Sequence, residues 1–304
     1  MSYSALVIGY GSVGKRHAEI LTEKDGISHV CVLSSQTALP YKTISSSEDI
    51  IGLEPDYFVI ASTTNQHYTQ LKFLEENFEG KKILVEKPLF DTMGDLEIIR
   101  NEVYVGYNLR FHPMMSKIKE LCKNRRLWNI HVFCGSYLPD WRLERNYRGT
   151  SSANKKLGGG VLLDLSHELD YVQWLAGSLE VEYVVSEKVS DLEIDSNDLL
   201  LLSGKTSDGA HVHISLNYFT RKPLRQILVD GDGISIRGDL TTNTLSVVDD
   251  GEASDFSWPK LGPKDTYQAQ HKAIIEDDQS YVCVFAEGLQ TMRLIDKIRS
   301  FKNS

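Results

Sequence analysis

A glycine-rich segment near the N-terminus places the strongest constraint on the fold of this chain. The apolar run Ala5–Ile8 has the pattern of a buried strand, and Gly9, Gly11 and Gly14 follow it with G-x-G-x-x-G spacing. In this pattern the first glycine permits a tight turn, the second lets a pyrophosphate approach the backbone, and the third lets the next helix pack against the strand. The alternative is a turn without a ligand. The strand before it and the helix after it favour a dinucleotide-binding loop, with the helix N-terminus facing the phosphates.

Composition narrows the class of protein. With 304 residues the chain is long enough for two domains, and its 41% hydrophobic and 25% charged residues are ordinary for a globular protein. The net charge of -9 argues against nucleic acid or an anionic membrane surface as a partner, because both usually require a basic surface. No apolar stretch approaches the roughly 18 residues of a membrane span. The first apolar run is also too short for a signal peptide, so we expect a cytoplasmic protein.

The cysteines give no sign of a metal centre or of disulfides. There are four, without C-x-x-C spacing, so neither a zinc site nor a disulfide framework is predicted and no metal is expected. They are Cys31, Cys122, Cys134 and Cys283.

Strand and helix patterns alternate through the N-terminal part of the chain, which is typical of a parallel sheet with crossover helices. We expect strands at 29–33, 56–62, 81–85 and 103–107, and helices at 15–23, 46–53, 66–78 and 93–100. The predicted fold class is therefore α/β, with a Rossmann domain, a doubly wound parallel sheet, over residues 1–108.

The end of the second strand bears on the choice of cofactor. An acidic residue about 20 positions after the glycines would bind the ribose 2′-hydroxyl of NAD. The chain instead has Ser34, Ser35 and Gln36 there, with neither a carboxylate to repel a 2′-phosphate nor an arginine to bind one. The expected cofactor is NAD or NADP, with NADP slightly favoured.

Polar residues follow the next strands, at the crevice where doubly wound sheets bind ligands. Thr63, Asn65 and His67 follow one strand, where they either contact the cofactor or belong to the start of the next helix. Glu86 and Lys87 follow another, and the proline after them restricts Lys87 to an extended backbone that places its charge over the crevice. The expected cofactor contacts are Gly9, Gly11, Ser12, Val13, Gly14, Ser34, Ser35, Ser62, Thr63, Asn65, His67, Glu86 and Lys87.

Four motifs give the chain a resemblance to a known family. They are the glycine loop at 9–14, Thr64-Asn65-Gln66-His67, Glu86-Lys87-Pro88, and the segment from Gly106 to Pro113. In combination they resemble the Gfo/Idh/MocA-type oxidoreductases, a family of NAD(P)-dependent sugar and cyclitol dehydrogenases. The resemblance covers nearly the whole chain and weakens after residue 230. It implies hydride transfer between a nicotinamide and a secondary alcohol or ketone of a sugar, nucleotide sugar or cyclitol.

The segment 139–156 is polar, aromatic and basic, and is expected to form a loop of a second domain over residues 109–304. Guanidinium groups suit carboxylates and phosphates, and aromatic rings suit sugar faces, so Tyr147 and Arg148 are candidate substrate contacts. The alternative is a flexible exposed loop. With the residues that the resemblance adds, the expected substrate contacts are Lys87, Asn108, Arg110, Tyr147, Arg148, Asp164 and His167.

Residues 161–176 have the spacing of one helix, which begins after three glycines. On a continuous helix Asp164, His167 and Glu168 would share a face, as either a surface ion pair or a carboxylate-oriented base. The family pattern separates Asp and His by four positions, whereas His167 follows Asp164 by three and Glu168 holds the fourth place. One residue corresponds to a turn of about 100° on a helix, so His167 or Glu168 could hold the proton-transfer position.

The resemblance also implies three catalytic residues. Lys87 would hydrogen-bond the reacting oxygen, His167 would accept or return the proton, and Asp164 would orient His167. Two other functions stay open. One is a nucleotide-sensing protein without catalysis, and the other is an enzyme that uses NAD transiently to cleave a glycoside with no net redox change.

Closely spaced strand patterns with Asp-Gly turns predict a mostly antiparallel, open sheet in the second domain, which makes that domain α+β. The strands are expected at 128–138, 181–185, 198–203, 211–219, 225–229, 234–237 and 245–248, and terminal helices at 266–276 and 285–301. One face of such a sheet would pack on helices and the other could meet another subunit. The resemblance accordingly implies a homodimer or homotetramer.

Overall fold

The computed structural model describes residues 3–302, which form two compact units. The first unit comprises the described residues up to Phe111 together with Gly262–Leu289. The second comprises His112–Leu261 together with the described residues from Gln290 onward. The division expected from the sequence, between residues 108 and 109, did not include the return of segment 262–289 to the first unit.

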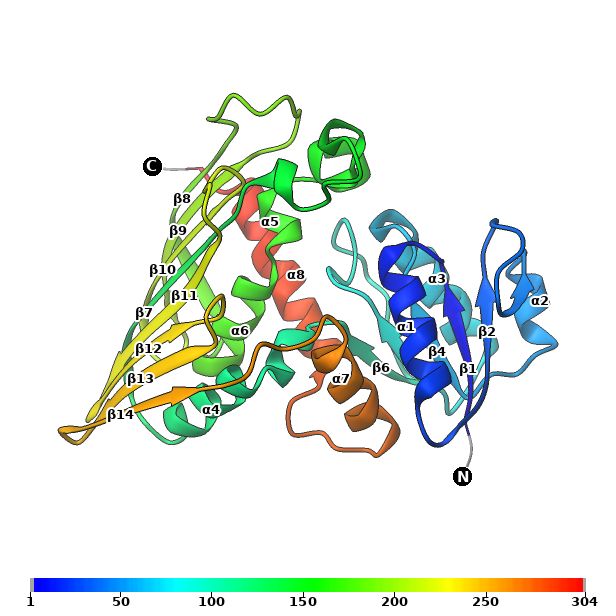
Figure 1. The fold of residues 1–304 in the computed structure, drawn as a ribbon, viewed down its shortest axis with the longest axis horizontal. Coiled ribbons are helices and arrows are strands. Elements are labelled where there is room, and N and C mark those ends of the chain that lie inside the picture. The colour runs from blue at the N-terminus through cyan, green and yellow to red at the C-terminus, as the bar shows by residue number, and fades with distance from the viewer. Residues whose placement is uncertain (1–2, 303–304) are drawn as a thin grey trace. The chain divides into compact units, whose positions relative to one another are not determined.

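The first unit is built on a seven-stranded sheet in the order β15-β6-β5-β4-β1-β2-β3 (Figure 1). Its strands are β1 (Tyr3–Ile8), β2 (Ile27–Leu33), β3 (Lys42–Ile44), β4 (Tyr57–Ile60), β5 (Lys82–Val85), β6 (Glu102–Val105) and β15 (Cys283–Val284). All neighbours are parallel except β15 and β6. This is the Rossmann strand order, whose direction reverses between β1 and β4, where such sheets bind ligands. The predicted doubly wound parallel sheet is confirmed.

The helices of this unit come from two parts of the chain. α1 (Ser12–Glu23), α2 (Glu48–Ile51) and α3 (Thr64–Asn77) belong to the N-terminal part, as does the single turn η1 (Asn108–Phe111). α7 (Asp265–Ile275) and the start of α8 (Phe285–Ser300) belong to the returning segment. α7 packs against α1 and η1, so the returning segment is part of the core of this unit.

The helix predicted at 93–100 is not formed, and that prediction was wrong. Residues 93–99 are irregular, and their backbone is held by α3. The carboxylate of Glu75, 6% exposed, accepts the backbone N–H groups of Ile99 at 2.7 Å and Arg100 at 2.6 Å. These bonds satisfy backbone donors that a helix would have paired internally.

The second unit is built on an eight-stranded sheet in the order β14-β13-β12-β11-β7-β10-β9-β8 (Figure 1). The strands are β7 (Leu127–Gly135), β8 (Leu179–Glu187), β9 (Leu199–Thr206), β10 (His211–Asn217), β11 (Leu224–Gly231), β12 (Ile234–Asp239), β13 (Thr244–Asp249) and β14 (Glu252–Ser257). Only β10 and β7 are parallel neighbours. The predicted mostly antiparallel sheet is confirmed, with β14 as a strand that was not anticipated.

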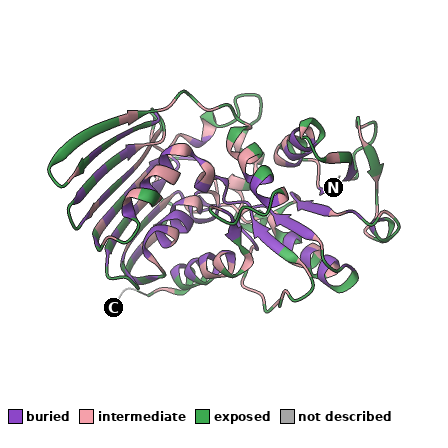
Figure 2. Cartoon of the chain, turned by 90° about the horizontal axis from the view of Figure 1, so that it is seen from below, coloured by how far each residue is buried: buried purple, intermediate pink, exposed green. Residues whose placement is uncertain are grey.

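One face of this sheet is covered and the other is open. α4 (Pro113–Cys122) and α6 (His167–Ala176) lie on the covered side (Figure 1), and buried residues alternate with exposed ones along the central strands (Figure 2). Register places Tyr183, Ser203, His213, His131 and Leu228 side by side on the open face. This alternation is the pattern of an antiparallel sheet with one solvated face.

Candidate functional site

The glycine loop between β1 and α1 has the geometry that a pyrophosphate site needs. Gly9 has φ +97°, and a Cβ there would lie 2.7 Å from Ser62 Cα, while a Cβ on Gly14 would overlap the carbonyl oxygen of Gly9. Beside Gly11 the space is open, since a Cβ would meet no atom within 4 Å. Gly11 is also the N-cap of α1, and no side chain caps that helix. The first N–H groups of α1, from Ser12 onward, are therefore available to an anion, and the loop fits a dinucleotide.

The segment after β2 is tied to this loop. The hydroxyl of Ser34 accepts the N–H of Gln36 at 3.1 Å, and the side-chain amide of Gln36 donates to the carbonyl of Tyr10 at 3.0 Å. Ser35 is exposed. The role of Gln36 in joining the two segments was not predicted. No acidic residue occurs between Ser34 and Lys42, so nothing in this stretch would repel a 2′-phosphate.

The residues after β4 divide into exposed and buried groups. Thr63 is the exposed N-cap of α3, and Asn65 is also exposed. His67 is 1% exposed, with Nδ1 3.1 Å from the carbonyl oxygen of Pro88 and Nε2 3.3 Å from that of Ser62. Burial lowers the pKa of His67, although the nearby carbonyl groups oppose this effect. His67 holds the end of β4 against the residues that follow Lys87, and we leave it out of the proposed cofactor contacts.

Glu86, directly after β5, belongs to a buried hydrogen-bonded chain. Its Oε1 lies 2.9 Å from Nε2 of His17, and Nδ1 of His17 lies 2.7 Å from Nε2 of His271. Nδ1 of His271 lies 2.8 Å from the hydroxyl of Tyr57. The other oxygen of Glu86, Oε2, accepts the backbone N–H of Lys87 at 3.1 Å. The chain therefore ends at the backbone of the candidate catalytic lysine.

One assignment of protons satisfies this whole chain. Tyr57 donates to Nδ1 of His271, Nε2–H of His271 donates to Nδ1 of His17, and Nε2–H of His17 donates to Oε1 of Glu86. Burial, together with the neighbouring His17 ring, holds the pKa of His271 well below its ordinary value, which favours a neutral imidazole. Because His17 and His271 are 254 positions apart, no local motif could have predicted their contact.

In the second unit, Asp164 ends the short helix α5 (Val161–Asp164). Its Oδ2 accepts a hydrogen bond from the hydroxyl of Tyr218 at 2.6 Å. Burial and the neighbouring Asp164 raise the pKa of Tyr218 well above its ordinary value, so this hydroxyl stays a donor. The ring of Trp141 packs edge-on against Tyr218, with centroids 5.3 Å apart. Tyr218 and Trp141 were not among the predicted site residues.

The prediction of one helix over 161–176 was wrong, because the chain breaks at Leu165, with φ -101° and ψ 33°. α6 begins at His167, so Asp164 and His167 lie on different helices, separated by two residues. The expected turn of about 100° per residue applies to a continuous helix and does not describe this segment. The break lets Asp164 reach Tyr218 after β10 while Glu168 reaches β11.

Glu168 forms an ion pair in which its carboxylate is buried. It is 0% exposed, and its Oε1 accepts a hydrogen bond from Nε of Arg225 at 2.6 Å. Burial opposes the charge of Arg225, but the carboxylate of Glu168 outweighs that effect and raises the pKa of Arg225. His167 is therefore the residue that we retain for proton transfer.

Two of the expected substrate contacts are held inside the first unit. Asn108, 6% exposed, donates to the hydroxyl of Thr266 at 2.9 Å. Arg110, 2% exposed, binds the carboxylate of Glu287 at 2.8 Å. Their side chains join η1 to the returning segment, and we leave both residues out of the proposed substrate contacts.

Tyr147 and Arg148 lie in a run of short helical turns after β7. The guanidinium of Arg148 stacks over the ring of Tyr147, 4.9 Å from its centroid, and forms an ion pair with Glu193. The hydroxyl of Tyr147 accepts the backbone N–H of Glu193 at 3.3 Å. These contacts order the loop. Because the charge of Arg148 is paired with Glu193, Tyr147 is the stronger of the two candidates for a ligand contact.

Residues 3–302 contain no group of three or more His, Cys, Asp or Glu side chains arranged to hold a metal ion. None of the helices in this range is long and apolar enough to cross a membrane. The four cysteines are buried free thiols.

Two family models match the chain. The NAD-binding Rossmann-fold domain of the Gfo/Idh/MocA oxidoreductase family matches residues 3–103, and the C-terminal domain of the same family matches residues 115–237. The chain belongs to the Gfo/Idh/MocA family. The resemblance carried by the four sequence motifs is confirmed.

The curated relatives are matched over only part of their own length. An uncharacterised oxidoreductase of Bacillus subtilis (strain 168) is 28% identical over 194 residues, which cover 57% of this chain and 53% of that protein. An inositol 2-dehydrogenase of Corynebacterium glutamicum (strain R) is 22% identical over 235 residues, which cover 69% of this chain and 66% of that protein. A further oxidoreductase of Bacillus subtilis is matched over 30% of its length. The chain thus spans about a third to two thirds of these relatives.

Solved structures share the Gfo/Idh/MocA fold over nearly the whole chain. The UDP-N-acetylglucosamine 3-dehydrogenase of Acidithiobacillus ferrooxidans has a TM-score of 0.79 at 17% identity and covers 100% of this chain and 98% of its own. A levoglucosan dehydrogenase in complex with NADH has a TM-score of 0.81 at 18% identity and covers 98% of this chain and 96% of its own. At these identities the similarity establishes the fold alone.

Proposed function

We propose that this protein is an NAD(P)-dependent oxidoreductase that transfers a hydride between nicotinamide and a secondary alcohol or ketone of a sugar-like polyol. The observation that carries the proposal is the uncapped N-terminus of α1, with open space beside Gly11, in a chain of the Gfo/Idh/MocA family. A dinucleotide bound there supplies or accepts the hydride, which no amino-acid side chain can do.

The residues of the chain would bind, orient and move one proton. Backbone N–H groups of the glycine loop bind the pyrophosphate. The ammonium of Lys87 binds the reacting oxygen and stabilises the negative charge that develops on it. His167 accepts the hydroxyl proton during oxidation and returns it during reduction. Asp164, held by Tyr218, is the residue proposed to orient His167.

The names of several relatives support a sugar-like substrate. They include inositol 2-dehydrogenases, a 1,5-anhydro-D-fructose reductase, a levoglucosan dehydrogenase and a UDP-N-acetylglucosamine 3-dehydrogenase. These names share a polyhydroxylated ring with a secondary alcohol or ketone as the reacting group, which is the chemistry proposed for this chain.

The test is to incubate the protein with NAD+ or NADP+ and, in separate reactions, myo-inositol, levoglucosan or UDP-N-acetylglucosamine. Nicotinamide absorbance and product mass are followed together. A substrate that loses two hydrogens while the cofactor is reduced supports the proposal. A mass change without net cofactor reduction would instead indicate transient use of NAD. Cofactor binding with no product from any substrate would indicate a nucleotide-sensing protein.

A further inference from the structure

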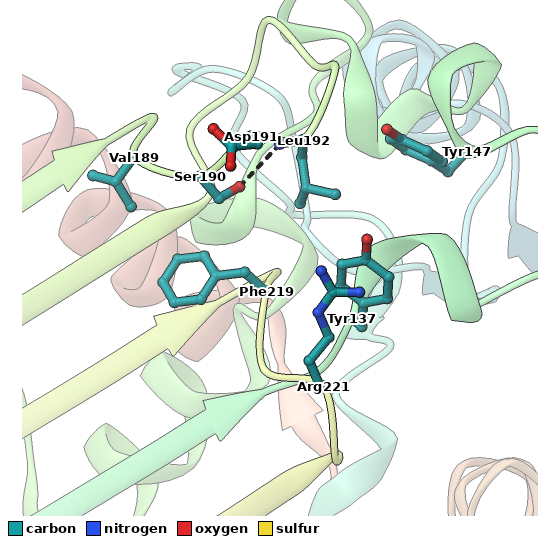
Figure 3. A pocket seen from close by; sticks show the side chains of 8 residues that line it. All are labelled: Tyr137, Tyr147, Val189, Ser190, Asp191, Leu192, Phe219 and Arg221. Carbon is teal, nitrogen blue, oxygen red and sulfur yellow. Dashed lines mark hydrogen bonds between the residues drawn. The ribbon is translucent and has the colours of Figure 1, made fainter.

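The second unit contains a pocket whose side chains the proposed mechanism does not use. Its volume is about 380 Å³, within the range of roughly 300–1,000 Å³ found for small-molecule sites. Figure 3 shows the residues that line it: Tyr137, Tyr147, Val189, Ser190, Asp191, Leu192, Phe219 and Arg221.

One wall of the pocket is the loop after β8, and a buried carboxylate fixes it. Asp198 is 0% exposed and accepts the backbone N–H groups of Val189 at 2.8 Å and Ser190 at 3.1 Å. The hydroxyl of Ser190 in turn accepts the N–H of Leu192 at 3.3 Å, the bond drawn in Figure 3. The carbonyl of Asp198 accepts the N–H of Tyr218 at 3.0 Å. The same residue thus orders the pocket loop and the neighbour of Asp164.

The opposite wall is the turn after β10. The side-chain oxygen of Asn217 accepts the backbone N–H groups of Phe219 at 3.1 Å and Thr220 at 2.9 Å. A Cβ on Gly135 would lie 2.8 Å from Cβ of Thr220, so the end of β7 packs directly against this turn. Because β7 and β10 are parallel, Tyr137 and Phe219 follow them at the same edge of the sheet.

The positive charge in this pocket comes from Arg221. Its guanidinium lies over the ring of Tyr137, with Cζ 3.8 Å from the centroid. Among residues 3–302 no carboxylate lies within ion-pair distance of Arg221, whereas Arg148 is paired with Glu193. An arginine that is stacked on an aromatic ring and lacks an acidic partner presents its donors to a carboxylate or phosphate.

The other lining residues suit a hydroxylated ring. Tyr147 and Phe219 offer flat apolar surfaces, against which a sugar face or a base can pack. The carboxylate of Asp191, also in the lining, can accept hydrogen bonds from a pair of hydroxyl groups. The pocket therefore combines ring surfaces, one acceptor for hydroxyls and one cation.

We propose that this pocket binds the anionic part of a charged sugar derivative. The substrate is then a nucleotide sugar or a sugar acid, and not a neutral cyclitol. The shared chemistry is a phosphate or carboxylate attached to a polyhydroxylated ring. Taking this ligand to be the substrate rests on the proposed oxidoreductase function.

Calorimetric titration tests the proposal, with saturating NAD+ present so that the glycine loop is occupied. The probes are UDP, GDP, glucuronate and myo-inositol. Arg221→Gln removes the positive charge in the pocket, and Lys222→Gln removes the adjacent positive charge; both residues are exposed, but Lys222 is not in the lining. At least one anionic probe should bind, and Arg221→Gln should weaken it by about tenfold or more, as for a lost charge-assisted hydrogen bond. Lys222→Gln should weaken it by less than about twofold, because Lys222, exposed like Arg221, does not line the pocket.

The choice of probes distinguishes a nucleotide sugar from a sugar acid as the source of the anion. It also separates failure of the pocket proposal from failure of the proposed oxidoreductase function. Binding of UDP or GDP indicates a nucleotide sugar, and binding of glucuronate alone indicates a sugar acid. The pocket proposal is overturned if no anionic probe binds, if Arg221→Gln has no effect, or if both variants lose affinity equally. If myo-inositol is oxidised while Arg221→Gln changes nothing, the oxidoreductase function stands and the pocket proposal fails. If UDP binds through Arg221 but no nucleotide sugar is oxidised or reduced, the pocket proposal stands and the oxidoreductase function fails.

Discussion

The buried ion pair of Glu168 and Arg225 should govern the stability of the protein and not proton transfer. Arg225→Met keeps an apolar stem and removes the guanidinium, which leaves the carboxylate of Glu168, 0% exposed, without its ionic partner. Oε2 of Glu168 has no hydrogen-bond partner within residues 3–302. Arg225 is therefore the main group that compensates for burial of this carboxylate.

The structure sets the size of the effect. Removing one partner of a buried ion pair costs about 3–5 kcal/mol. For a domain of this size each kcal/mol lowers Tm by about 2–4 °C, so Arg225→Met should lower Tm by about 6–20 °C. The side chain of Arg225 is 24% exposed and keeps some contact with water. Glu168→Gln should therefore cost less, about 1–3 kcal/mol.

Thermal and urea unfolding of both single variants check these values. The double variant Arg225→Met with Glu168→Leu carries neither charge and should recover much of the loss of Arg225→Met. Turnover of Glu168→Gln, measured well below its Tm, should stay close to that of the wild type. If Glu168→Gln left Tm unchanged but removed activity, Glu168 would hold the proton-transfer position and the reasoning would be wrong.

Four further predictions concern the cofactor site, the proposed mechanism, pH and assembly. Lys87→Met should lower kcat by about 10² to 10³ with little change in cofactor Kd; an equally large rise in that Kd would assign Lys87 to cofactor binding instead. By fluorescence titration NADP(H) should bind at least as tightly as NAD(H), and Ser35→Asp should shift the preference to NAD(H); a wild-type preference for NAD(H) above about tenfold would contradict the argument. Burial lowers the pKa values of His67 and His271. Below the ordinary histidine pKa of about 6.5 the unfolded chain binds more protons, so the free energy of unfolding should fall from pH 7 to pH 5 by up to about 1.4 kcal/mol per pH unit and histidine. His271→Asn should reduce this slope in urea unfolding, while the exposed His211→Asn should not. Finally, light scattering should report a homodimer or homotetramer, and Leu228→Asp on the open sheet face should reduce the mass if that face is the interface.

The parts of the fold that were predictable are those fixed by local sequence. Strands buried on both faces read as continuous apolar runs, and the spacing of Gly9, Gly11 and Gly14 encodes a particular backbone. The failed helix at 93–100 had a suitable pattern, but the carboxylate of Glu75 takes its backbone donors. A donor claimed by a residue of another element leaves no trace in the local sequence.

As with the fold, the parts of the candidate site that were predictable are those fixed by local sequence. The break between α5 and α6 lets Asp164 and Glu168 reach their partners. These are Tyr218 and Arg225, which lie 54 and 57 positions further along the chain. Arg110 belongs to a recognisable motif, yet its guanidinium is buried against Glu287. A motif therefore marks that a side chain is needed, without showing whether it faces a ligand or the core. The roles of Lys87 and His167 stay predictions.

The discontinuity of the first unit has a consequence for synthesis on the ribosome. His271, which completes the chain from Tyr57 to Glu86, lies in a segment translated after the entire stretch 112–261. At ~5–20 residues per second, roughly ten to forty seconds separate the emergence of Phe111 from that of Leu289. During that interval the nascent N-terminal sheet lacks β15 and α7, and the stretch 112–261 of the second unit is synthesised before them. The unit that begins the polypeptide thus cannot be completed until the chain has been translated as far as Leu289.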